Sequence, residues 1–420
     1  MYSYIQSESF FGLKDPESLL QEIGSPLYVY NERILRDRMR KMKNLISYPR
    51  FTSNYSIKAN SNIHILKMAL EEGLDADAMS PGEILFLERA GFPPEKILFI
   101  PNNVSAEEMV FASQRGIVTS LDSLSQLERF GQVCPNTKCA LRLNPGVGAG
   151  HHEKVITAGK NTKFGVLLSD IPEALEISEK YGLTICGINQ HIGSLFMSPE
   201  PFMQAAANFL QAAEPFPDLE FVDFGGGFGI PYKKLQGEKP FDYVDLGKQM
   251  DQLISDWVQK TGRDMLFKIE PGRFVVAEGG IILGLVHAVK TNAGVKYCGT
   301  DIGMNTLIRP STYGSWHDIE LYRDGSIVES DVTETVTVVG NICESGDILA
   351  KDRDLPPLQI GDIICVLDAG AYGYAMSSAY NNRPQPAEVL ICEDGTVRLI
   401  RKQETIEDLL RQFPAFDSAD

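Results

Sequence analysis

The pattern of apolar and polar positions changes character near residue 273. Before that point, short β-rich runs end in polar or glycine-containing turns and alternate with segments whose apolar residues recur at helical spacing. We expect eight strands here, at 51–58, 74–78, 96–101, 117–121, 138–143, 183–191, 219–224 and 265–270. Alternating β and α elements favour a parallel sheet, and eight repeats predict an α/β fold, a closed (β/α)8 TIM barrel.

The second part of the chain has almost no helical spacing. Its β-rich runs lie at 281–289, 317–322, 332–339, 363–367, 387–391 and 397–402, and Asp-Gly pairs punctuate them. This pattern predicts a C-terminal antiparallel β domain with a final amphipathic helix at 406–413. The early strand PLYVY, at 26–30, is expected to join that domain. The predicted domains are therefore 31–275 for the barrel, and 1–30 with 276–420 for the β domain.

Charge narrows the class of partner. The chain has 420 residues and a formal net charge of -17, which argues against nucleic acid and anionic membranes, since both require a basic face. Small-molecule chemistry is favoured instead. No run approaches the roughly 18 apolar residues of a membrane span, and the N-terminus lacks the basic and apolar regions of a signal peptide. We expect a cytoplasmic protein.

Cysteine and histidine usage predicts no metal site. The seven cysteines are scattered and lack CxxC spacing, which suits a reducing compartment. Of the six histidines, only His151 and His152 are adjacent.

Polar residues gather where the predicted barrel strands end. In TIM barrels the active site is built at these carboxyl ends. The residues in question are Lys58, Asp77, Arg142, His191, Gly225, Gly226, Gly227, Glu270 and Arg273. An amine, an imidazole, carboxylates, guanidinium groups and glycines would thus converge on one rim, which is an unusual choice for a purely structural barrel.

The glycine run and its neighbours predict a cofactor. Glycines 225–227 let backbone N–H groups approach an anion, and the loop after the seventh strand is the usual phosphate site of a TIM barrel. Arg273 could add a second phosphate contact. A phosphate, a reactive Lys58 and a carboxylate at Glu270 together indicate pyridoxal 5'-phosphate, with Glu270 keeping the pyridine nitrogen protonated.

Three rim residues have alternative interpretations. His191 could stack on the cofactor ring or be an ordinary core histidine. Asp77 and Arg142 could contact the cofactor or be buried ion-pair partners of the rim.

Six motifs carry a resemblance to a known family. They are YSIKAN at 55–60, HIGS at 191–194, GGGFG at 225–229, EPGR at 270–273, CESGD at 343–347 and DAGAYGYAMSSAYNNRP at 368–384. In this order they resemble the fold-type III, alanine-racemase-like PLP decarboxylases, over residues 27–401. The members that act on diaminopimelate are the most similar.

The resemblance implies roles for further residues. Ser194 of HIGS and Tyr372 of GAYG belong to the cofactor site, and Tyr372 and Arg273 also reach the substrate. Cys343 comes from the second subunit of a homodimer with shared active sites and protonates the carbanion left by CO2 loss, while its neighbour Glu344 binds the distal amine of the substrate.

A further pair, Arg309 and Tyr313, resembles the family's clamp on a distal carboxylate. The implied reaction is decarboxylation of meso-diaminopimelate to L-lysine. The alternatives are a decarboxylase of D-lysine, D-ornithine or L-ornithine, an amino-acid racemase, and a non-catalytic binding relative.

Two positions depart from the family pattern. Asn189 stands where a second histidine is frequent, and Leu195 stands where glutamine is frequent. We expect neither to contact Lys58, Glu270 or the Arg309 clamp.

Overall fold

The computed structural model describes residues 10–144, 163–411 and 413–414, which form two compact units. The barrel unit comprises Arg36–Pro231 and Lys239–Val275, and the β unit comprises Met1–Leu35, Tyr232–Glu238 and Val276–Asp420. This division differs from the predicted boundaries mainly at Tyr232–Glu238, which interrupts the barrel sequence but groups with the β unit.

Eight parallel strands close the barrel. The sheet runs β5-β4-β3-β2-β10-β9-β8-β6, and a β5–β6 pairing joins its two ends. The strands are β2 (Phe51–Ser56), β3 (Asp75–Ala78), β4 (Ile97–Phe99), β5 (Val118–Leu121), β6 (Lys138–Asn144), β8 (Thr184–Asn189), β9 (Phe221–Asp223) and β10 (Leu266–Ile269), with a short β7 (Val166–Leu167) beside β6. All eight predicted barrel strands are confirmed.

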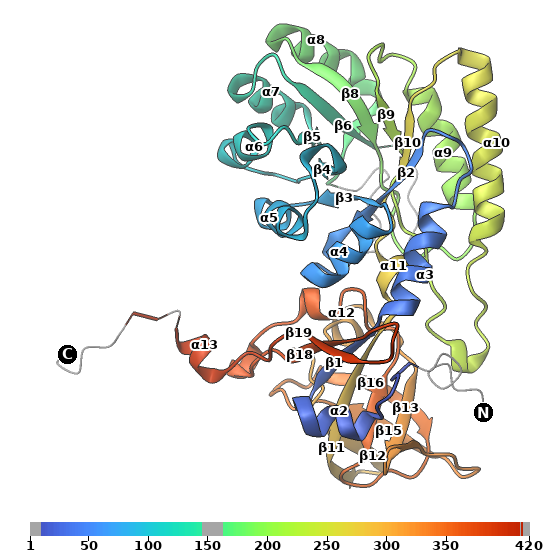
Figure 1. The fold of residues 1–420 in the computed structure, drawn as a ribbon, viewed down its shortest axis with the longest axis vertical. Helices are drawn as coiled ribbons and strands as arrows, with labels where there is room; N and C mark the ends of the chain where they lie inside the picture. The colour runs from blue at the N-terminus through green and yellow to red at the C-terminus, as the bar shows by residue number, and fades with distance from the viewer. Residues whose placement is uncertain (1–9, 145–162, 412, 415–420) are drawn as a thin grey trace. The chain divides into compact units, whose positions relative to one another are not determined.

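Helices lie outside the barrel strands (Figure 1). They are α3 (Glu32–Lys43), α4 (Ile63–Glu71), α5 (Pro81–Ala90), α6 (Ala106–Ser113), α7 (Leu124–Val133), α8 (Ile171–Tyr181), α9 (Glu200–Ala212), α10 (Tyr243–Thr261) and the short α11 (Arg273–Val276). Capping residues define where several of these helices begin. Ser105 and Glu108, for example, form a reciprocal capping box at the N-terminus of α6. Aromatic packing then fixes helix to strand, as where Trp257 of α10 meets Phe267 of β10 edge-on at 6.2 Å.

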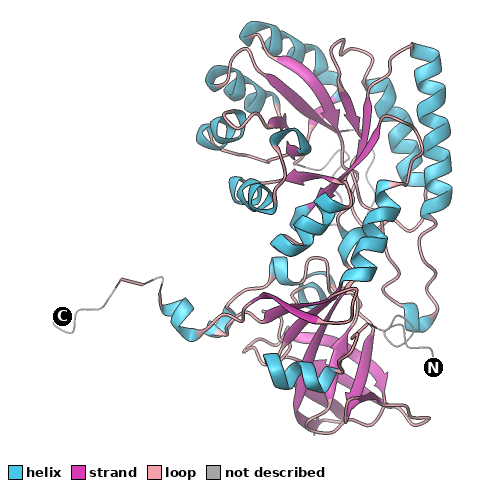
Figure 2. Cartoon of the chain, in the orientation of Figure 1, coloured by secondary structure: helices cyan, strands magenta, loops and turns pink. Residues whose placement is uncertain are grey.

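The β unit is mainly strands, as Figure 2 shows. Its elements are α2 (Pro16–Ile23), β1 (Leu27–Asn31), β11 (Gly280–Asn292), β12 (Val295–Thr300), α12 (Arg309–Tyr313), β13 (Ile319–Arg323), β14 (Ser326–Ile327), β15 (Glu334–Val339), β16 (Ile348–Leu355), β17 (Ile363–Val366), β18 (Ala387–Ile391), β19 (Val397–Arg401) and α13 (Ile406–Leu410). The sheet order is β14-β13-β17-β11-β1-β18-β19, and β12, β15 and β16 extend it from β11.

Strand β1, early in the chain, pairs with strands of this unit. β1 pairs antiparallel with β11 and parallel with β18. Its side chains are buried on both faces: Leu27 and Val29 belong to the apolar core, while Tyr30 donates its hydroxyl hydrogen to Glu388 at 2.7 Å. The β12–β15 pair is also parallel, so the sheet is mostly rather than wholly antiparallel. Strands β12, β14 and β16 were not predicted.

No helix in the described ranges combines the length and apolar character that crossing a bilayer requires.

Candidate active site

Lys58 lies directly after the first barrel strand. The chain leaves β2 in a single 3-10 turn, Ile57–Ala59, whose two apolar residues are buried while Lys58 between them is only partly buried. The two buried neighbours thus hold the backbone on either side of Lys58. Its positive charge opposes the rise in the pKa values of Asp77 and Glu270 and contributes to the fall in the pKa of His191. The amine therefore lies among these three groups.

The glycine loop after β9 fits between two neighbouring strand ends because it has no side chains. A Cβ on Gly225 would stand 2.1 Å from the carbonyl oxygen of Gln190, and one on Gly226 would stand 1.9 Å from that of Glu270. Gly225 also has φ +77° and Gly227 has φ +114°, which other residues rarely adopt. Each glycine is therefore required by the packing of the rim.

The backbone N–H groups of this loop differ in their partners. Gly225 donates to Asp223 Oδ1 at 2.9 Å, and Gly226 donates to His191 Nδ1 at 3.3 Å. The N–H of Gly227, which is partly exposed, has no acceptor among the described residues. It is a loop donor available to an anion such as a phosphate.

Two carboxyl groups are buried together at the ends of β9 and β10. Burial raises the pKa of Asp223 to about 7, and burial together with the charge of Asp223 raises that of Glu270 to about 8. Lys58 and Arg142 act in the opposite direction on Glu270. Without a ligand the pair therefore favours a shared proton, and a cation placed beside Glu270 would favour its ionised form.

A third carboxyl group, Asp77, lies at the end of β3 and is fully buried. It accepts a hydrogen bond from the Ser56 hydroxyl at 2.7 Å, while its Oδ1 has no hydrogen-bond partner in the described part of the chain. Burial, followed by the charge of Glu270, raises its pKa well above the ordinary value. Arg142 in β6 is also buried, which lowers its pKa, and Glu270 is the largest of the charges that oppose this effect.

His191 is held as a neutral acceptor. Burial lowers its pKa well below the ordinary value, and Lys58 and Arg142 lower it further. An unprotonated Nδ1 agrees with the hydrogen bond from Gly226. The imidazole therefore ties the end of β8 to the glycine loop.

Arg273 begins α11 and is buried. Its Nη2 donates to the Ser194 hydroxyl at 3.0 Å, which brings two predicted site residues together. A guanidinium and a hydroxyl next to the glycine-loop segment form a donor set suited to a phosphate.

Asn189 corrects one expectation from the sequence. Its Nδ2 donates to Glu270 Oε1 at 3.5 Å, and its Oδ1 accepts from the Ser120 hydroxyl at 2.6 Å. The expectation that Asn189 contacts none of the key groups is therefore wrong. It lies at the end of β8, and inward side chains at this level of a barrel converge.

The barrel chemistry also includes residues that the sequence interpretation missed. Asp223 braces Gly225 and receives a hydrogen bond from Asn54 Nδ2 at 3.3 Å. Both are fully buried polar residues on barrel strands. The rule that selected Asp77, a polar residue at a strand end, would also have selected Asp223.

The remaining predicted residues belong to the β unit. Cys343 is exposed, unlike the six other cysteines, which are buried. Its backbone N–H donates to Asn381 Oδ1 at 3.0 Å, and Glu344 next to it accepts from the Tyr380 hydroxyl at 2.5 Å. Asp347 shapes this loop by accepting the N–H of Ile342 at 2.7 Å.

Arg309 is the first residue of the short helix α12, and Tyr313 is its last. Arg309 is buried, donates to His317 Nε2 at 2.7 Å and lies 4.6 Å from the ring centroid of Tyr232. His317 in turn donates from Nδ1 to the carbonyl of Leu367 at 2.8 Å. The guanidinium is thus held in one orientation.

Tyr372 has φ +56°, a left-handed backbone conformation that is unusual for an aromatic residue. The structure therefore separates the predicted residues into a barrel group around Lys58 and three places in the β unit: the Cys343 loop, the Arg309 helix and Tyr372. The adjacent His151 and His152 lie outside the described residues.

Comparisons with known proteins show what the chain is similar to. Residues 32–277 match the family model described as pyridoxal-dependent decarboxylase, pyridoxal binding domain. The chain is 41% identical over 410 residues to a diaminopimelate decarboxylase of Methanothermobacter thermautotrophicus, covering 95% of this chain and 94% of that one. It is 36% identical over 412 residues to the Escherichia coli enzyme of that name, covering 94% and 96%.

A solved structure gives the same fold. Diaminopimelate decarboxylase from Helicobacter pylori, complexed with L-lysine, is similar with a TM-score of 0.86 and 32% identity, over 94% of this chain and 98% of that one.

Proposed function

The chain belongs to the pyridoxal-dependent decarboxylases, and on that premise we propose that it removes CO2 from meso-diaminopimelate to give L-lysine. The observation that carries the proposal is the barrel rim, where the Lys58 amine, the Glu270 carboxyl and the N–H of Gly227 lie on one set of strand ends. The relatives named diaminopimelate decarboxylase and the relative complexed with L-lysine support the choice of substrate.

The barrel residues fit pyridoxal 5'-phosphate, the cofactor of this family. Lys58 would hold its aldehyde, Gly227 and Arg273 its phosphate, and Glu270 its pyridine nitrogen. The raised pKa of Glu270 supports this assignment, because a cation beside the carboxyl relieves the burial of its charge. When bound, the cofactor supplies an electron sink for the pair released with CO2.

The other barrel side chains act by holding this arrangement. His191 keeps the glycine loop against β8, and Asn189 restrains Glu270. Asp77 and Arg142 set the local charge around Lys58 and Glu270. These residues position the reactive groups and limit the water around them.

The β unit supplies substrate contacts in this proposal. Arg309 and Tyr313 bind the distal carboxylate, Glu344 binds the distal amine, and Tyr372 approaches the cofactor site. Cys343 of a second subunit delivers the proton to the α-carbon, so the active form is a homodimer with shared sites. The exposure of Cys343 supports this role, since a thiol enclosed in its own subunit could not reach a partner.

The test is a comparison of substrates. The purified protein with added pyridoxal 5'-phosphate is incubated separately with meso-diaminopimelate, D-lysine, D-ornithine and L-ornithine, and released CO2 and the amine product are measured. We expect CO2 and L-lysine from meso-diaminopimelate alone. CO2 from lysine or ornithine would leave the role of Lys58 unchanged but contradict the assignment of Arg309 and Tyr313 to a distal carboxylate. Absence of CO2 from all four substrates would contradict the proposed decarboxylase activity.

A further inference from the structure

A cavity in the β unit is lined wholly by residues of that unit. Its volume is about 480 Å³, within the usual range for small-molecule sites. Residues of β13 and β16 and the segment around residue 330 line it, together with Trp316 and Arg353. None of the residues assigned to decarboxylation is among its lining residues. We call it the Arg353 cavity.

The most distinctive feature of this cavity is the guanidinium group of Arg353. Arg353 is only 8% exposed, yet none of its side-chain nitrogens has a hydrogen-bond or ion-pair partner among the described residues, and its Nε is fully enclosed. A buried guanidinium without an acceptor is costly, because each unpaired donor loses its bonds to water. An anionic oxygen entering the cavity would satisfy it.

Trp316 fixes the position of this guanidinium. The Arg353 group lies 2.9 Å from the indole centroid, and the indole Nε1 donates to Asp318 Oδ1 at 2.8 Å. Asp318 Oδ2 accepts the backbone N–H of Leu235 at 2.9 Å, so both of its oxygens are engaged. The stack is therefore held before any ligand arrives, and little ordering is required on binding.

The remaining charge in the cavity wall is negative. Four exposed acidic residues, Glu329, Asp331, Asp352 and Asp354, belong to the lining, and none has an ion-pair partner within the described ranges. One enclosed guanidinium beside several carboxylates disfavours phosphates and dicarboxylates. It favours a ligand with one carboxylate and at least one ammonium group.

We propose that the Arg353 cavity is a second, non-catalytic ligand site that binds a basic amino acid, with the ligand carboxylate on Arg353 and its ammonium groups among the acidic residues. L-Lysine is the probe of choice, a choice that rests on the proposed function because L-lysine is the product. The binding claim itself does not depend on decarboxylation.

The chain offers a direct reporter of this cavity. It contains two tryptophans, Trp257 in the barrel unit and Trp316 in the cavity. In a Trp257→Phe holoenzyme, emission therefore comes from Trp316 alone. We expect L-lysine to change this emission in a saturable way, whereas cadaverine, which lacks the carboxylate, and glutarate, which lacks ammonium groups, leave it unchanged.

Variants in the same background locate the ligand. Arg353→Gln should raise the Kd for L-lysine at least about tenfold, as expected for loss of a charge-assisted pair. The control Arg398→Gln removes an exposed arginine of β19 and should leave the Kd unchanged. Retained emission change with an unaltered Kd in Arg353→Gln, or no emission change in the parent, overturns the proposal.

Two further readouts separate this proposal from the proposed function. CO2 release from meso-diaminopimelate should be unchanged in Arg353→Gln, which excludes damage to the barrel site as the reason for lost binding. Should that variant fail to fold, the ligand series on the parent still decides, because equal responses to L-lysine, cadaverine and glutarate would overturn the ligand class. Absence of CO2 release in every form would count against the decarboxylase and leave the emission result standing.

Discussion

The barrel unit and the β unit differ in how their buried carboxyl groups are paired. In the barrel unit, Asp77, Asp223 and Glu270 lie at neighbouring strand ends, and their pKa values rise chiefly because they are buried. In the β unit, Glu388 pairs with Arg401, and Asp368 pairs with Lys234 at 2.5 Å.

The pairing determines how much buried charge each unit leaves uncompensated. The β unit pairs these two carboxyl groups with its own cations, although burial still raises the pKa of Asp368 to about 7 and its Oδ2 has no hydrogen-bond partner among the described residues. The barrel rim leaves charge repulsion and unsatisfied polar atoms, such as Asp77 Oδ1, that a cationic cofactor ring and a substrate would relieve. Arg353 of the β unit has no hydrogen-bond or ion-pair partner among the described residues, which is why it carries the proposal of a second site.

The largest expected effect comes from removing one chemical group from each unit. Lys58→Ala and Cys343→Ala should each lower kcat by about 10³-fold, the range for loss of a proton-transferring or covalent group. If the sites are shared between subunits, mixing and re-pairing the two inactive variants should restore about a quarter of wild-type activity by random pairing. CO2 release is the measurement, and each variant mixed with itself is the control.

No recovery in the mixed sample, with mixed dimers demonstrated by differently tagged chains, would contradict shared sites. The barrel unit and the β unit of one chain would then suffice for one site.

The next largest effect is expected on stability, from breaking an ion pair of the β unit. Lys234 lies 2.8 Å from Glu278 and 2.5 Å from Asp368, and all three are largely buried. Lys234→Met removes the cation that lies beside two buried carboxylates, so we expect a loss of about 3–5 kcal/mol in the free energy of unfolding at pH 7. Urea denaturation measures it.

The exposed neighbour Lys239 offers a matched control, since Lys239→Met should change the free energy of unfolding by less than about 0.5 kcal/mol. A similar small change for Lys234→Met would mean that the β unit does not depend on this pair.

Neutralising a buried carboxyl group of the barrel should instead increase the free energy of unfolding. The folded pKa of Glu270, about 8, lies above its ordinary 4.5. The folded apoprotein therefore holds a proton that the unfolded chain has lost, and stability falls as pH rises through this window. Glu270→Gln removes that cost, so the cofactor-free variant should be more stable than wild type by about 1–3 kcal/mol at pH 8, and the difference should shrink toward pH 5.

The matched comparison is Glu388→Gln in the β unit, which takes the anionic partner from Arg401 and should destabilise the protein at the same pH. Thermal unfolding of the apoproteins at pH 5 and pH 8 reads both variants. Destabilisation by Glu270→Gln at pH 8 would break the contrast between the units.

The sequence predicted the barrel more completely than the β unit for a physical reason. Barrel strands and helices alternate in the chain, so hydrophobic spacing alone reveals them. Strand β16 instead contains Lys351, Asp352, Arg353 and Asp354 in succession, with Asp352 at φ +50° beside an irregular pairing with β15. From sequence alone, four consecutive charged residues indicate a loop, and only the pairing with β15 shows that they form a strand.

The candidate site shows the same division. Lys58 and Glu270 could be found because strand ends converge in a barrel, but the contact of Asn189 with Glu270 needed the register of β8. The stack of Arg353 on Trp316 joins segments far apart in the sequence, and no local pattern announces it.

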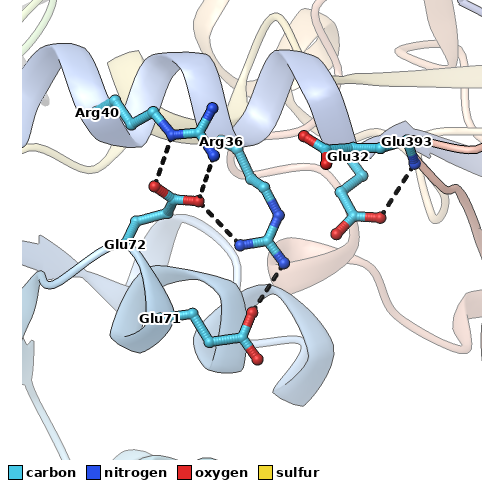
Figure 3. Close-up of polar contacts among 6 residues, drawn as sticks. All are labelled: Glu32, Arg36, Arg40, Glu71, Glu72 and Glu393. Atoms are coloured by element: carbon cyan, nitrogen blue, oxygen red, sulfur yellow. Dashed lines mark hydrogen bonds and ion pairs between the residues drawn. The ribbon is translucent and has the colours of Figure 1, made fainter.

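The smallest effect is expected at a surface cluster of the barrel unit, shown in Figure 3. Arg40 of α3 forms two hydrogen bonds to Glu72, at 2.7 and 2.9 Å, and Arg36 bonds to the same carboxylate at 2.9 Å. Burial raises the pKa of Glu72, but the hydrogen bonds from Arg40 and Arg36 outweigh it and lower the pKa overall.

Arg40→Gln should therefore cost about 0.2–1 kcal/mol, because Arg40 is 56% exposed and its partner is still held by Arg36. A lowered folded pKa means that this contribution is present at neutral pH and is lost as pH falls through the folded pKa of Glu72. High salt should also reduce it. The control is Lys43→Gln on the same helix, a lysine with no ion pair among the described residues. A double-mutant cycle with Glu72→Gln, read by urea denaturation, isolates the pair; a coupling energy as large as the effect of Lys234→Met would show that surface charges stabilise the barrel unit as strongly as buried pairs stabilise the β unit.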